Sequence, residues 1–169
     1  MSHEDVYCGV DPGSKGAIAF ICPARGCAIV VNIPIVKEIG TSRTFTYCDG
    51  EGLVALLRKY NPIRTFLERV HAMPTDGPVG AFSFGDGYGT IKGAHAGCDI
   101  PITRYLPSTW KRQMGLTSDK QAAKAKAKLL FPKLAHLITR PDHAEALMLC
   151  LYGMLRLGIK PARDIVLWN

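Results

Sequence analysis

The sequence has no stretch apolar enough to suggest a membrane-spanning helix. Its longest candidate, residues 144–159, contains Glu145 and Arg156, whereas a spanning helix needs about 18 or more apolar residues. The first five residues are polar and acidic, without the basic segment and apolar core of a secretory signal. Internal repeats, low-complexity tracts and linkers are also missing. We therefore expect one domain covering residues 1–169, located in the reducing cytoplasm.

Cysteine spacing of the kind that binds zinc or forms a redox motif is absent as well. The six cysteines stand at positions 8, 22, 27, 48, 98 and 150, with no Cys-x-x-Cys pair among them. Several lie within apolar segments, where cysteine behaves as a small hydrophobic residue. Because disulfides are rare in reducing compartments, we interpret these cysteines as structural thiols.

Negative charge is scarce in one part of the chain. Residues 101–140 contain nine Lys or Arg residues and a single acidic residue, a net charge of +8. Residues 1–100 carry a net −1 and residues 141–169 are neutral, so this one segment accounts for the overall +7. A localised basic surface is typical of a protein that binds a polyanion. A solvated, lysine-rich helix face is the alternative, and charge alone does not separate the two.

Runs of apolar residues predict an alternation of strands and helices. Apolar, β-branched segments bounded by turn residues predict the following strands: 6–10, 17–22, 28–35, 65–70 and 100–106. Helical spacing and capping patterns predict the following helices: 50–60, 79–96, 107–115, 119–130 after a Ser118 cap, and 141–157. This order predicts a three-layer α/β domain, with a mixed five-stranded sheet and helices on both faces.

The helix expected at residues 79–96 is rich in glycine. Each interior glycine costs about 1 kcal/mol relative to alanine, so close packing against a neighbour has to compensate. We expect Phe82 and Phe84 to lie in the core on this helix.

Four carboxylates stand where a negative charge needs an explanation. Asp11 follows an expected strand and precedes Pro-Gly, and Glu68 interrupts an apolar strand, where an unpaired charge would be costly to bury. Asp142 and Glu145 are three residues apart at the start of an apolar helix, hence on one face. Each has an ordinary alternative: a turn residue, a buried ion pair with an arginine, or acids favoured at a helix N-terminus.

Taken together, the four carboxylates predict a metal centre. Two-metal phosphodiester hydrolysis needs hard oxygen ligands that hold cations about 3.5–4 Å apart. Clustered carboxylates repel one another unless cations neutralise them. Four such residues in a basic protein therefore favour a metal-dependent nuclease.

The order of several motifs resembles a known family. The motifs are GVDPG at 9–13, FLERV at 66–70, FSFGDGYG at 82–89, PSTWK at 107–111 and DHAEA at 142–146. In this order they resemble the RuvC-type Holliday-junction resolvases, particularly the small RuvC-like proteins encoded by phages. The resemblance implies an RNase H-like fold, a homodimer, and symmetrical nicking of four-way DNA junctions that depends on Mg²⁺ or Mn²⁺, with two ions per active site.

The resemblance also implies roles for the acidic residues. Asp11, Glu68, Asp142 and Glu145 correspond to the metal-binding and catalytic carboxylates, with Asp11 bridging the two ions. Glu145 stands where aspartate is common in the bacterial enzymes, a conservative departure that lengthens the ligand by one methylene. His143 is expected to lie on a different helix face, outside the ligand set.

Basic residues and one loop position complete the implied site. Lys111 and Lys120 resemble the family lysines that contact phosphate near the cut, and either could offset charge on the transition state. Lys124 and Lys128 follow Lys120 on one helical face and either extend this track or form a solvated face. His71 replaces an aromatic residue of the bacterial enzymes and could still stack on a base. By analogy, the helix at residues 79–96 is the expected dimer surface.

Three other functions would also account for parts of this sequence. An endonuclease for forks and flaps would use the same site, whereas a non-catalytic junction-binding protein would have no need of four clustered carboxylates. The pattern Asp-x-Gly-x-x-Gly at residues 11–16 also occurs in sugar-kinase and actin-like ATPases. Those proteins need two lobes, for which 169 residues are too few.

Overall fold

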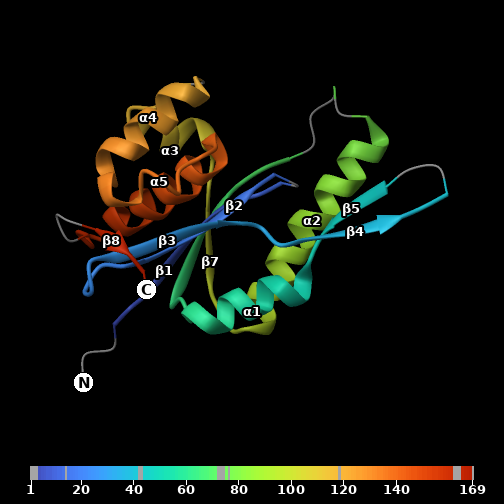
Figure 1. Cartoon of the computed structure of the whole chain (residues 1–169), viewed down its shortest axis with the longest axis horizontal. Coiled ribbons are helices and arrows are strands. Elements are labelled where there is room, and N and C mark those ends of the chain that lie inside the picture. The colour runs from blue at the N-terminus through green and yellow to red at the C-terminus, as the bar shows by residue number, and fades with distance from the viewer. Residues whose placement is uncertain are drawn as a thin grey trace.

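A mixed β-sheet forms the centre of the protein (Figure 1). The computed structural model describes residues 4–13, 15–41, 44–71, 75, 77–117, 119–161 and 165–168. The sheet has the order β7-β6-β1-β2-β3-β8, and its strands are β1 (Tyr7–Asp11), β2 (Ala17–Cys22), β3 (Cys27–Asn32), β6 (Arg64–Glu68), β7 (Ile102–Tyr105) and β8 (Val166–Leu167). β1, β2 and β3 pair antiparallel, while β6 runs parallel to β1 and β7 parallel to β6.

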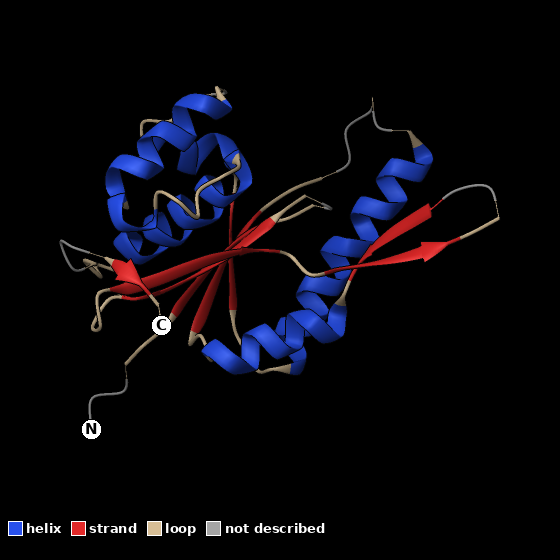
Figure 2. Ribbon diagram, viewed as in Figure 1, coloured by secondary structure: helices blue, strands red, loops and turns tan. Residues whose placement is uncertain are grey.

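Helices cover both faces of this sheet (Figure 2). They are α1 (Gly50–Tyr60), α2 (Pro78–Gly97), α3 (Pro107–Gln113), α4 (Lys120–Leu130) and α5 (Pro141–Arg156), with a 3₁₀ turn η1 (Pro132–Leu134). Side chains alternate between the faces of β2: Ile21 packs into a core with α3, α4 and α5, whereas Phe20 packs into a second core with α1 and α2. The three-layer α/β arrangement predicted from the sequence is therefore confirmed.

Helix α5 packs directly on the strands that lead to the carboxylates. Two glycines permit this close approach, because a Cβ at Gly9 would collide with the Ala146 carbonyl and one at Gly153 with the Phe66 ring. The helix is buried from His143 to Met154. Although α5 is largely apolar, no helix among the described residues is long and apolar enough to cross a membrane.

The prediction of five strands was wrong in two places. The strand expected at 28–35 ends at Asn32, because Pro34 cannot donate a ladder hydrogen bond, and the chain continues into a separate hairpin of β4 (Ile35–Ile39) and β5 (Thr44–Cys48). The sixth strand of the main sheet, β8, pairs in parallel with β3 over two residues. A two-residue strand is too short to produce an alternating pattern in the sequence.

The hairpin and α2 project together from the body of the protein (Figure 1). Helix α2 matches its predicted range closely, but the expected core position of Phe82 was wrong, since this side chain is 77% exposed. Phe82 lines a cavity together with Phe45 and Tyr47 of the hairpin. Phe84 is partly buried. We refer to the β4–β5 hairpin and residues 78–87 of α2 as the arm.

Helix α4 begins with a different cap from the one predicted. Asp119 is the cap, and its Oδ1 accepts hydrogen bonds from the backbone N–H groups of Gln121 at 2.8 Å and Ala122 at 3.3 Å. The predicted cap, Ser118, lies outside the described residues.

Candidate metal centre

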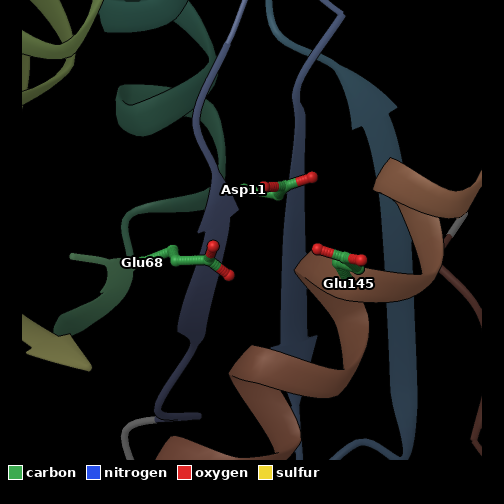
Figure 3. Close-up of side chains that lie close together, drawn as sticks. All are labelled: Asp11, Glu68 and Glu145. Atoms are coloured by element: carbon green, nitrogen blue, oxygen red, sulfur yellow. The ribbon is translucent and has the colours of Figure 1, made fainter. Parts of the chain in front are cut away.

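Three carboxylates converge at one edge of the sheet (Figure 3). Asp11, Glu68 and Glu145 each offer an oxygen within 4.8 Å of the others. Parallel pairing sets Val10 opposite Leu67, so the next residues, Asp11 and Glu68, end neighbouring strands side by side. Helix α5, held close by the glycines described above, brings Glu145 over the same edge.

Burial and mutual repulsion shape the electrostatics of this cluster. Burial is the main reason that the pKa of Asp11 is raised well above its ordinary value, and the charge of Glu145 raises it further. Glu68 and Asp142 act in the same direction, while Lys111 lowers this pKa. Burial also raises the pKa of Glu68, against the opposing charge of Lys111. Ionisation of all the carboxylates in the cluster is therefore unfavourable, and a bound cation would offset that cost.

The geometry and the donor set fit a hard divalent cation. Oxygen ligands bind Mg²⁺ and Ca²⁺ at about 2.0–2.6 Å, so two ligands of one ion lie up to about 4–5 Å apart. The separations within the cluster fall in this range. Carboxylate oxygens are the ligands preferred by Mg²⁺, Ca²⁺ and Mn²⁺. Asp11, Glu68 and Glu145 could therefore hold a metal ion.

The fourth predicted ligand, Asp142, lies beside this group rather than within it. Among the described residues, the mutually close set contains only the other three carboxylates. Asp142 is partly exposed in the first turn of α5, and its Oδ2 lies 3.9 Å from Arg140 Nε. Its charge still reaches Asp11, whose pKa it raises.

Helix α3 contacts two of the three clustered carboxylates through consecutive residues. The Trp110 indole Nε1 donates a hydrogen bond to Glu68 Oε2 at 3.1 Å. Lys111 Nζ donates to Glu145 Oε2 at 2.7 Å in a partly buried ion pair. Burial lowers the pKa of Lys111, but its hydrogen bond to Glu145 and the charges of Glu68 and Asp11 outweigh burial and leave this pKa raised. Lys111, predicted to contact phosphate, is thus bound to a carboxylate.

Sequence reasoning missed the contact of Trp110. A buried tryptophan usually finds a partner for its N–H. That general rule could have indicated a polar partner, although not its identity.

The other predicted basic residues surround the cluster at different distances. Lys120 is exposed at the start of α4 and lines an open groove together with Lys111 and Glu145. Lys124 and Lys128 lie further along α4 and are partly buried. His71 is exposed shortly after β6. The structure thus groups Lys111 and Lys120 with the carboxylates and leaves the other three residues outside that groove.

A hydrogen-bond network anchors the N-terminal end of α5. His143 is buried, with Nε2 2.7 Å from Asn32 Oδ1 and Nδ1 2.8 Å from the Leu137 carbonyl. Arg140 Nη2 donates to Asn32 Oδ1 at 2.7 Å and to the Lys15 carbonyl at 2.8 Å. Burial lowers the pKa of His143. This network ties the start of α5 to β3 and to the β1–β2 turn, and sequence reasoning missed it.

Comparison with solved structures identifies the fold. Thermus thermophilus RuvC, solved in complex with a Holliday junction substrate, superposes with a TM-score of 0.58 at 17% identity, covering 94% of this chain and 99% of that one. A second structure of RuvC from the same organism gives a TM-score of 0.55 at 16% identity, over 93% and 99% of the two chains. The chain has the RuvC fold. The yeast mitochondrial Holliday junction resolvase Ydc2 gives 0.55 at 14% identity, over 89% of this chain and 78% of that one.

Sequence comparison adds no closer likeness. The sequence matches no protein-family model and no curated protein sequence. At identities of 14–17%, the structural likeness establishes the fold alone. The RNase H-like architecture expected from the motifs is confirmed in this way.

Proposed function

We propose that this chain is a divalent-metal-dependent endodeoxyribonuclease that resolves four-way DNA junctions by paired symmetrical nicks. The observation that carries the proposal is the convergence of Asp11, Glu68 and Glu145 at one edge of a RuvC-fold sheet. The basic segment of residues 101–140 supplies the charge that a DNA substrate requires. T. thermophilus RuvC has been solved with a Holliday junction bound. We place this activity in the cytoplasm, as expected from the sequence.

The carboxylates would hold Mg²⁺ or Mn²⁺, with two ions per site. Divalent ions in such a site activate water and stabilise charge on the phosphate oxygens. Asp11, Glu68 and Glu145 would share one ion, and Asp142 would contribute to a second from the first turn of α5, with Asp11 between the two. Since ligand carboxylates must be ionised, the raised pKa values of Asp11 and Glu68 make metal binding weaker as the pH falls.

The basic side chains would position the DNA backbone. Lys111 and Lys120 line the groove beside the carboxylates, where either could contact the scissile phosphate and offset its transition-state charge. Lys124 and Lys128, one and two turns further along α4, would continue the track along the duplex without reading its sequence. His71, exposed beyond the end of β6, would stack against an unpaired base.

Paired nicks require two active sites, and we propose a homodimer formed through α2. Its outer face carries a stripe of exposed glycines at 85, 89, 93 and 97, where an added Cβ would meet nothing within 4 Å beyond its own helix. Such a stripe allows a second helix to approach closely. Beside it, Val79 is 64% and Phe82 is 77% exposed. A second copy of α2 would cover these apolar side chains.

Cleavage of a four-way junction whose branch point cannot migrate, in the presence of Mg²⁺, tests the proposal. We expect wild type to cut opposite strands at symmetrical positions, Asp11→Asn to be inactive, and Glu51→Gln, which removes an exposed acid on α1, to cut normally. Undiminished cutting by Asp11→Asn would refute the site. Rates on fork, flap and linear duplex substrates decide the substrate class: preference for forks or flaps would replace junction resolution with a broader branched-DNA activity.

A further inference from the structure

Trp110 holds a hydrogen-bond donor against a candidate metal ligand from inside the hydrophobic core. Its side chain is fully buried in the cluster formed by α3, α4 and α5 against the sheet. From there Nε1 donates to Glu68 Oε2 at 3.1 Å. Core packing leaves a ring of this size little rotational freedom, so the donor occupies a fixed place. The carboxylate that receives it is itself only 7% exposed.

A fixed donor on one oxygen orients a carboxylate without using up its capacity to bind a cation. Each carboxylate oxygen has more than one lone pair, so Glu68 keeps acceptor sites for a cation shared with Asp11 and Glu145 after it accepts the indole N–H. Hydrogen bonds to metal ligands commonly set the ligand orientation in this way. The indole is also neutral, so it exerts no net charge repulsion on an incoming cation.

Lys111, the next residue, makes the opposite kind of contact. Its ammonium forms an ion pair with Glu145 and lies 5.4 Å from the centroid of the Trp110 ring. A positive charge at this place stabilises the carboxylates when no metal is bound, but it competes with a divalent cation. Two consecutive residues of α3 therefore contact the same cluster, one as a neutral orienting donor and the other as a competing charge.

We propose that Trp110 is a positioning residue that orients Glu68 for divalent-cation binding, and that its indole reports directly on the occupancy of the centre. This inference rests on the metal centre in the proposed function. It does not depend on which DNA structure is cut.

The two tryptophans of the chain allow a clean spectroscopic test. Trp168 lies elsewhere, with its ring centroid 5.2 Å from that of Tyr60 and beneath Arg25. A Trp168→Phe protein therefore has Trp110 as its single tryptophan. Titrating this protein with Mg²⁺ alone, without DNA, should produce a saturable change in Trp110 emission. The change should vanish when Glu68→Gln is added.

Calorimetry measures the positioning effect itself. Trp110→Phe keeps a buried aromatic ring but removes the N–H, and we expect its Mg²⁺ affinity to fall about 10-fold, the lower end of the range for lost hydrogen bonds to metal ligands. Lys111→Met should shift the affinity in the other direction, and Trp168→Phe should leave it unchanged. Far-UV circular dichroism establishes that each variant is folded.

The outcomes separate this inference from the proposed function. Equal Mg²⁺ affinities for wild type and Trp110→Phe would overturn the role inferred for Trp110. Two other results would also overturn it: calorimetric Mg²⁺ binding without a change in Trp110 emission, and no Mg²⁺ binding by wild type. If Mg²⁺ binds with the expected dependence on Trp110 and no branched DNA is cut, the inference stands and the proposed function fails. If Trp110→Phe does not fold, the emission titration of the Trp168→Phe protein still tests whether Trp110 responds to Mg²⁺ through Glu68.

Discussion

The edge of the sheet that carries the carboxylates and the arm differ in how their side chains are partnered. At the sheet edge, β1, β6, α5 and α3 all contribute contacts, and Glu68 and Glu145 are each only 7% exposed. In the arm, by contrast, Ile39 is 91% and Phe82 is 77% exposed. The first region is organised within one chain, whereas the second leaves apolar surface that gains from being covered.

This difference suggests that the two regions serve different functions. A preorganised cluster of charges suits the chemistry of a small cation, and an exposed apolar arm suits assembly. One contact between them is made by Tyr88, which follows the arm in α2 and whose hydroxyl donates to the backbone carbonyl of Glu68 at 3.3 Å. Substitutions in one region should therefore affect one property and leave the other nearly intact, apart from effects that pass through this contact.

The largest expected effect comes from neutralising a ligand at the sheet edge. Glu145→Gln should reduce junction cleavage about 10³-fold, because a bound metal supplies several kcal/mol of transition-state charge stabilisation. Junction affinity, measured by gel shift, should change little. The exposed acid Glu51, changed to Gln, serves as the control, and equal activity of the two variants would show that Glu145 is not a ligand.

The next effect tests the arm. Phe82→Glu places a charge in the proposed dimer surface, so sedimentation should show a monomer, and cleavage should yield single nicks rather than paired ones. The monomer should remain folded, because substitutions at exposed positions change the stability of the chain itself by about 0.5 kcal/mol or less. Leu129→Glu, at a side chain 81% exposed on α4, controls for added surface charge. A Phe82→Glu protein that remains dimeric would place the interface elsewhere.

A smaller effect concerns stability. Asp11→Asn should abolish cleavage but raise the stability of the metal-free protein. The pKa values of Asp11 and Glu68 are raised, so their protonated forms stabilise the fold. This contribution is fully present below the ordinary pKa range of carboxylic acids, and it is lost as the pH rises through the raised values. At neutral pH and without metal, Asp11→Asn should therefore melt a few degrees above wild type, by the scaling of about 1 kcal/mol to several degrees.

Added Mg²⁺ provides the check on that stability prediction. It should raise the melting temperature of wild type more than that of Asp11→Asn. The difference between the two melting temperatures should therefore become smaller or change sign. An Asp11→Asn protein that melts below wild type in EDTA would contradict the repulsion inferred for the cluster.

The smallest effect belongs to the lysines outside the groove. If Lys124 and Lys128 contact phosphates, each change to Gln should reduce the slope of log affinity against log salt by about 1, with a loss of affinity that is uniform across DNA sequences. Lys59→Gln, on the opposite face of the sheet, should leave the slope unchanged. Unchanged slopes for all three variants would favour the solvated-face alternative for α4.

Local sequence patterns predicted the body of the fold well and the arm poorly. The strands that carry Asp11 and Glu68 are continuous apolar runs bounded by turn residues, which are strong signals. The β4–β5 hairpin is half-exposed and contains Lys37 and Glu38, so its pattern was weak. The exposure of Phe82 depends on where α2 extends past the sheet, and no local pattern encodes that.

The carboxylates that cluster could be predicted from the sequence, but their hydrogen-bond partners could not. Asp11 at a strand end, Glu68 within an apolar strand and Glu145 at the start of an apolar helix stood out, as did Asp142, which lies beside the cluster. The hydrogen bond between Trp110 and Glu68 joins residues 42 positions apart, and that between His143 and Asn32 joins residues 111 apart. Contacts of this separation arise from the packing of α3 and α5 on the sheet, which the sequence does not specify residue by residue.

The proposed role of Asp11 in a metal centre that cuts DNA can be tested by comparing wild type and Asp11→Asn on one labelled four-way junction. Binding is measured in Ca²⁺ and cleavage in Mg²⁺. We expect both proteins to bind the junction with similar affinity and only wild type to cut it. Cleavage by Asp11→Asn at the wild-type rate would contradict this role.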